Sequence, residues 1–76
     1  MRLRLPAASA RKVIRALQRA GFVIHHTTGG HTIMRHVSDL TLRVTVPMHN
    51  GDLRSSTMRM IIKQSGLSID QFIEFL

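Results

Sequence analysis

The 76-residue sequence contains no cysteine, tryptophan or tyrosine, and its only aromatic residues are three phenylalanines. Without cysteine there is no disulfide, thiolate nucleophile or cysteine-based zinc site, which fits a reducing compartment. Without tyrosine and tryptophan, binding of nucleic acid by base stacking is not expected. No apolar run approaches the roughly 20 residues that span a bilayer, and the basic N-terminus lacks the apolar stretch of a signal peptide. We therefore expect a soluble, cytoplasmic protein that does not contact membranes.

Acidic residues are also scarce, and the formal net charge is +7. The four acids, Asp39, Asp52, Asp70 and Glu74, all lie in the second half, so the first 38 residues are basic without any compensating acid. Charge of one sign favours a polyanion, usually nucleic acid, although an acidic protein partner would satisfy it too. Four scattered carboxylates do not suggest a two-metal site, and we expect no metal or other cofactor.

The segment from Ala10 to Ala20 is predicted to be an amphipathic helix. Ser9 precedes it as an N-cap candidate, and Gly21 follows where helices take a terminal glycine. Apolar residues recur in it at three- and four-residue spacing. Its basic residues lie outside that stripe: Arg11, Lys12, Arg15 and Arg19. This cationic row either binds phosphates or forms a solvated helix face, and both interpretations stay open because no acid within a turn pairs with it.

Three strands and two further helices are predicted to follow. β-Branched and apolar residues indicate strands at 22–27 and 31–36, joined by a glycine turn, and alternation is clearest at 40–46. Residues 58–65 have helical spacing, with N-cap candidates at 55–57 and Gly66 at the end. Ser68 and Gln71 have the spacing of a capping box before a short last helix at 69–76.

This order of elements predicts an α+β fold with the sequence α-β-β-β-α-α. We expect a two-layer arrangement, in which three antiparallel strands carry helices on one face, formed as a single domain over residues 1–76. It is the general layout of double-stranded RNA-binding domains.

The turn Gly29-Gly30 followed by His31 is the candidate site. Two glycines allow close approach of a phosphate, and an exposed imidazole at a strand end can transfer protons near neutral pH. The alternative is a hairpin turn followed by an ordinary surface histidine. Arg35 shares a strand face with His31, two positions further along that face, and is a candidate phosphate contact.

The other histidines do not form a predicted metal site. His25 and His26 are adjacent in a strand and point to opposite faces, and His36 is separated from His31 by an odd number of residues. His49, in the loop after Pro47, is either a second proton carrier or a plain loop histidine.

Several segments resemble the HicA-type toxins, small ribonucleases of toxin–antitoxin pairs. Ser9 to Phe22 is similar to the first helix of that family with its Ala-Gly-Phe exit. Gly29-Gly30-His31 resembles the family's Gly-Ser-His strand, Val44 to His49 resembles its Val-Pro-x-His segment, and Thr57 to Gly66 resembles its second helix. Leu67 to Phe72 is similar to its tail. The chain departs from the usual pattern at Gly30, where serine is commoner, and at Ser56, where glycine is usual.

The resemblance implies a toxin of a type II toxin–antitoxin system with a double-stranded-RNA-binding-like fold. It implies that the protein cleaves messenger RNA, that His31 is catalytic, and that a HicB-type antitoxin covers the site and joins the toxin in an oligomeric complex. Because the RNA 2′-hydroxyl is itself the nucleophile, such cleavage requires only proton transfer and charge stabilisation, without a metal. The expected RNA-binding residues are Arg11, Lys12, Arg15, Arg19, Gly29, Gly30 and Arg35.

Two other function classes remain compatible with the sequence. A non-catalytic RNA-binding module would use the same basic helix and the same layout. A protein-interaction domain would dock an acidic partner through its basic face and show little RNA affinity even at low salt.

Overall fold

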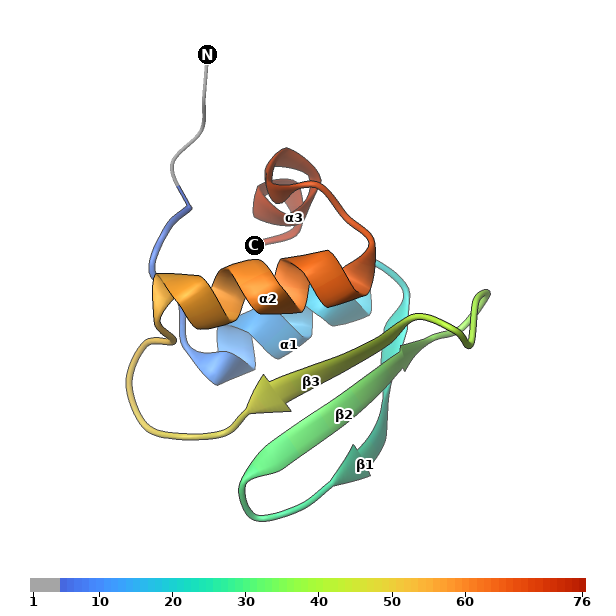
Figure 1. The fold of residues 1–76 in the computed structure, drawn as a ribbon, viewed down its shortest axis with the longest axis horizontal. Helices are drawn as coiled ribbons and strands as arrows, with labels where there is room; N and C mark the ends of the chain where they lie inside the picture. Colours follow the sequence, from blue (N-terminus) through green and yellow to red (C-terminus); the bar gives the residue numbers. More distant parts are fainter. Residues whose placement is uncertain (1–4) are drawn as a thin grey trace.

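The computed structural model describes residues 5–76 and shows three helices and a three-stranded sheet among them (Figure 1). In chain order these elements are α1 (Ala10–Arg19), β1 (Phe22–Thr27), β2 (His31–His36), β3 (Arg43–Pro47), α2 (Ser55–Ser65) and α3 (Ile69–Phe75). The α+β class and the predicted order are confirmed. No helix among the described residues is long and apolar enough to cross a membrane.

Helix α1 begins and ends where the sequence predicts. The Ser9 side chain accepts a hydrogen bond from the Lys12 N–H at 3.3 Å, which satisfies a free donor of the first turn. After Arg19 the chain leaves the helix through Gly21, whose φ of +102° is in a region that L side chains rarely adopt. The apolar stripe of α1 is buried, and its basic residues are exposed.

The three strands form one antiparallel sheet in the order β1-β2-β3. Strand β2 is central, and β1 is interrupted by an irregularity between Ile24 and His26. The β1–β2 connection is the two-glycine turn, whereas residues 37–42 join β2 to β3. All three helices lie on the same side of the sheet (Figure 1).

The core lies between that face of the sheet and helices α1 and α2. Met34, Val44 and Val46 point into it from β2 and β3 and are completely buried, and Thr32 joins them as a buried polar residue. Phe72 of α3, also fully buried, closes the core from the other side of the helices. Burial of Thr32 and Met34 decides which face of β2 is internal, because side chains alternate along a strand. His31, Ile33 and Arg35 therefore belong to the outer face.

Two predicted boundaries were wrong. Strand β3 begins at Arg43 instead of residue 40, because the backbone turns at Asp39: its carboxylate accepts from the Thr41 N–H at 3.0 Å and its carbonyl accepts from the Leu42 N–H at 3.0 Å. Leu40 is consequently exposed. Helix α2 begins three residues early, at Ser55, and its N-cap is Arg54, which makes no side-chain capping bond. The capping box of α3 and the glycine at the end of α2 are confirmed.

Candidate functional site

His31 is the first residue of β2 and is exposed on the outer face of the sheet. Thr28 fixes its backbone: the Thr28 N–H donates to the His31 carbonyl at 2.9 Å, and the Thr28 hydroxyl oxygen accepts from the His31 N–H at 3.0 Å. The same oxygen accepts from the Gly30 N–H at 3.3 Å. The imidazole is therefore presented to solvent from a turn in which the N–H groups of Thr28, Gly30 and His31 are hydrogen-bonded.

The register of the sheet assembles an outer face from all three strands. His31 lies opposite Pro47 of β3. The next row across the sheet is His26, Ile33 and Thr45, and the row after that is Val23, Arg35 and Arg43. Arg35 thus shares the face of His31 as predicted, but four residues along a strand correspond to roughly 13 Å. That separation is between Cα atoms, and it places the two residues near opposite ends of β2.

A cavity lies beside the His31 end of the sheet. The Met48 N–H donates to the Gly30 carbonyl at 2.9 Å, which ties the loop after β3 to the glycine turn. This loop and the start of α1 border an open cavity of about 340 Å³, lined by Arg11 and His49 together with Ser9, Ala10, Met48, Asn50 and Gly51. The structure therefore places Arg11 and His49 together, next to the turn that carries His31.

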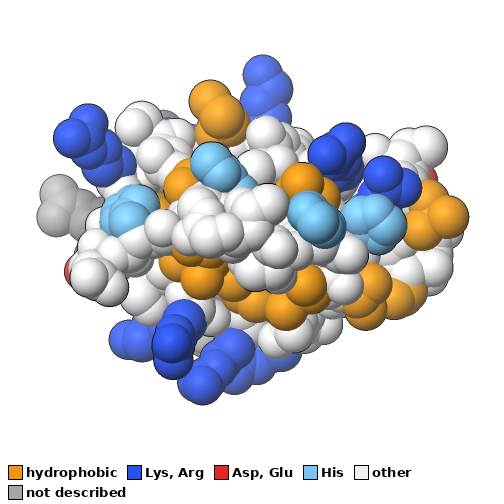
Figure 2. Space-filling view, turned by 90° about the horizontal axis from the view of Figure 1, so that it is seen from below, with side chains coloured by type: hydrophobic (Ala, Val, Ile, Leu, Met, Phe, Trp, Pro, Cys, Tyr) orange, Lys and Arg blue, Asp and Glu red, His pale blue; other side chains and the backbone are white. Residues whose placement is uncertain are grey.

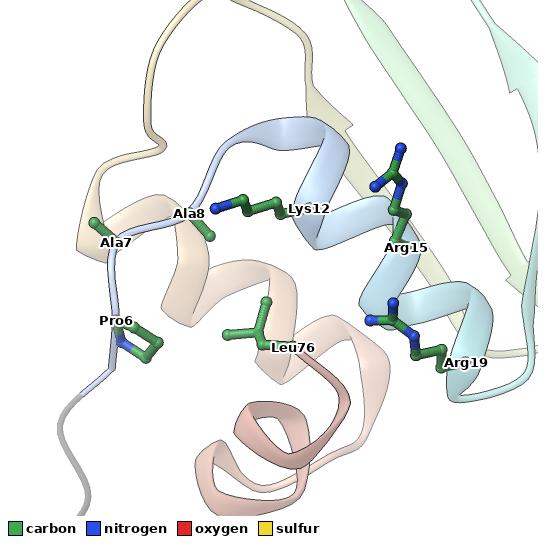
Figure 3. Close-up of a pocket in the computed structure, with 7 residues that line it drawn as sticks. All are labelled: Pro6, Ala7, Ala8, Lys12, Arg15, Arg19 and Leu76. Carbon is green, nitrogen blue, oxygen red and sulfur yellow. The ribbon is translucent and has the colours of Figure 1, made fainter.

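The rest of the cationic row of α1 lies elsewhere. Lys12, Arg15 and Arg19 line a second cavity of about 380 Å³ with residues 6–8 and Leu76, and no strand residue contributes to it (Figure 3). The Arg19 guanidinium donates to the Phe75 carbonyl at 2.7 Å, so it also holds α3 against α1. The predicted RNA-binding residues are thus divided between the sheet face, the loop cavity and this groove.

The His36 side chain packs against neighbouring residues and uses both ring nitrogens in hydrogen bonds within the protein. Its ring packs edge-on against Phe22 with the ring centroids 5.0 Å apart. Its Nδ1 accepts from the Ser38 N–H at 3.0 Å, so Nε2 carries the proton and donates to the Ala20 carbonyl at 3.1 Å. Among residues 5–76, no group of three or more His, Asp or Glu side chains is arranged to hold a metal ion.

Histidine side chains are spread across the edge of the molecule that Figure 2 shows, with Lys and Arg side chains on both sides of them and almost no acidic side chain. Among the acids, the Asp39 carboxylate accepts hydrogen bonds from the hydroxyl and the N–H of Thr41. These two bonds hold the pKa of Asp39 below its usual value. The basic side chains on this surface suit an anionic ligand.

Three residues of this region were not predicted from the sequence to belong to the site. Arg43 and His26 join the outer face only through the strand register, which sequence patterns do not give. Thr28 holds the turn through its hydroxyl, and a threonine before two glycines was a signal for this role.

The fold and this face define a small basic α+β domain with an exposed imidazole at a hairpin. The family model described as HicA toxin of bacterial toxin-antitoxin systems matches residues 10–67, a span that includes the sheet, α1 and α2. The chain therefore belongs to the HicA toxin family, the toxins of toxin–antitoxin pairs with a HicB-type antitoxin. No curated protein matches the chain.

Proposed function

We propose that this toxin is a metal-independent endoribonuclease that cleaves messenger RNA, with His31 as the residue that transfers a proton in the cleavage step. The observation that carries the proposal is the position of His31: exposed at the first residue of β2, with its backbone fixed by Thr28, on a basic face. The family is generally one of RNase toxins, which supports the same activity here.

The chemistry requires little of the protein. The RNA 2′-hydroxyl attacks the adjacent phosphorus, its proton passes to a base, and the 5′-oxygen leaves with a proton, giving a 2′,3′-cyclic phosphate and a 5′-hydroxyl end. His31 performs one of these proton transfers. Arg11, beside the glycine turn, stabilises charge on the phosphate, and His49 in the same cavity is the candidate for the other proton transfer. Gly29 and Gly30, which have open space around their Cα atoms, let the RNA backbone approach.

The other basic residues predicted to bind RNA do not act at the cleaved bond in this proposal. Lys12, Arg15 and Arg19 form a groove away from the strands, so they attract RNA through long-range charge without contacting the scissile phosphate. We further infer that residues 1–76 act as one domain and that a HicB-type antitoxin inhibits cleavage by covering His31, which holds the pair together as an oligomer.

Incubation of purified protein with RNA in the presence of EDTA tests the activity. The wild type is expected to give 2′,3′-cyclic ends, and His31→Ala is expected to lose about 10²- to 10⁴-fold in rate while keeping its circular dichroism spectrum. His25→Ala is the matched control, since His25 is an exposed histidine of β1 outside the paired register. Equal cleavage by wild type and His31→Ala would refute the assignment, and intact RNA in a shifted band would indicate a binding module instead.

A further inference from the structure

Arg35 and Arg43 face each other on the outer sheet surface, at the end of β2 remote from His31. They are directly paired in the β2–β3 register, so their Cα atoms are about 5 Å apart and their side chains leave the same face. Like charges in directly opposed positions destabilise a sheet. Val23, the neighbour of Arg35 on β1, supplies no negative charge.

The Arg35 side chain is also incompletely satisfied. It is half-buried, and its Nε is buried without a hydrogen-bond partner among residues 5–76. A buried donor without a partner costs free energy in the isolated protein. Asp39, the acid nearest in sequence, is already bonded to Thr41. The opposed positive charges of Arg35 and Arg43 indicate a place where an external anion would be stabilised, through the terminal guanidinium nitrogens and not through the buried Nε of Arg35.

We propose that Arg35 and Arg43 form a second phosphate-binding site of the RNA substrate, remote from the cleavage site. A phosphodiester has one negative charge and two free oxygens, so one oxygen can accept from each guanidinium. Arginine is well suited to such planar, two-point recognition. This assignment rests on the proposed function, because it takes the RNA to be the ligand of the face that carries His31.

The placement of this site sets how the RNA lies on the protein. The Cα atoms of His31 and Arg35 are roughly 13 Å apart along β2, so the two phosphates are expected at different points along the strand. Between them the face presents His26, Ile33 and Thr45, a row without lysine or arginine. The substrate is therefore a single strand laid along β2, held by a phosphate a few nucleotides from the cleaved bond. Very short RNAs reach only the His31 end.

Salt-dependent binding of an uncleavable RNA tests the site. A short 2′-O-methyl oligouridine has no free 2′-hydroxyl, so binding is measured without cleavage. Arg43→Gln is expected to weaken its binding about tenfold at low salt, as the loss of one charge-assisted hydrogen bond predicts. The slope of log K against log salt should decrease in magnitude by about 0.7, the value for one phosphate contact on a single strand. The matched control is Arg59→Gln, which removes the same charge from an exposed position of α2.

Three outcomes decide the proposal. A lower slope for Arg43→Gln with an unchanged slope for Arg59→Gln supports it. Equal losses in both variants would overturn it, because net charge alone would then explain binding. Binding of a polyglutamate peptide that depends on Arg43, with no such dependence for the oligouridine, would overturn it in favour of a protein interface. Failure of the proposed function is recognised separately, as cleavage that does not change in His31→Ala.

Discussion

Thr28 and His31 are joined by reciprocal hydrogen bonds across the glycine turn: the Thr28 N–H donates to the His31 carbonyl, and the Thr28 hydroxyl oxygen accepts from the His31 N–H. The hydroxyl is within 3.3 Å of the Gly30 N–H as well. A single side chain therefore fixes the backbone on which the proposed catalytic imidazole stands.

Replacing Thr28 with Val is expected to lower the cleavage rate more than it lowers stability. Valine has the shape of threonine without the hydroxyl. The Gly30 and His31 N–H groups therefore lose their acceptor and donate to water instead. The free energy of unfolding should decrease by about 0.5–1.5 kcal/mol in urea titrations. Cleavage should fall because a loosely held imidazole is less often in the reactive position. Thr28→Ser keeps the hydroxyl and should retain activity; an inactive Ser variant would show that the methyl group is what matters.

His49 is expected to give the pH–rate profile its second limb. It shares a cavity with Arg11 beside the glycine turn, and its Nδ1 lies 3.0 Å from the Asn50 carbonyl, which orients the ring. If it transfers the second proton, the wild-type profile of kcat/KM is bell-shaped and that of His49→Gln keeps one limb only. A bell-shaped profile in His49→Gln would assign the second limb to another group. His25→Gln serves as the control for altered charge.

Gly21→Ala is expected to destabilise the fold more than Gly66→Ala does. Both glycines have positive φ, +102° and +78°, so both substitutions introduce backbone strain of about 1–3 kcal/mol. At Gly21 the new Cβ would also lie 2.7 Å from Nε2 of His36, whereas at Gly66 it makes an ordinary contact of 3.5 Å with Leu42. Urea midpoints of the two variants measure the difference, and equal midpoints would show that the His36 ring moves aside at no cost.

Gly30→Ser is expected to be tolerated by the fold. No atom lies within 4 Å of a Cβ built at Gly30, and its φ is not in the positive range. Restricting the unfolded chain should leave stability unchanged or raise it by up to about 1 kcal/mol. Serine is the residue commoner at this position in the family pattern, so cleavage should not decrease. A folded Gly30→Ser protein with strongly reduced cleavage would show that the RNA backbone approaches residue 30 too closely for any side chain.

Local sequence patterns were sufficient to predict most helices and strands, because caps, terminal glycines and alternation act over only a few residues. Ser9 and Gly21 limit α1 through a cap and a left-handed residue, and Ser68 with Gln71 starts α3, as predicted. Strand β3 was placed three residues too early because alternation continues from Leu40, while the Asp39 turn breaks the pairing there. Helix α2 was predicted to begin at residue 58 because capping side chains were sought at 55–57. The helix begins at Ser55, and its N-cap, Arg54, makes no side-chain capping bond that a sequence pattern could reveal.

The sequence by itself determined the order of elements, the excess of positive charge, the glycine turn with His31 after it, and the resemblance to the HicA family. These depend on residue identity and short spacings. Only the tertiary structure decided which face of β2 is internal, because alternation is the same for both faces until Thr32 and Met34 are packed against helices. It also paired Arg35 with Arg43, placed Arg11 beside the glycine turn and separated Lys12, Arg15 and Arg19 from His31, since strand register and helix docking decide which distant residues meet.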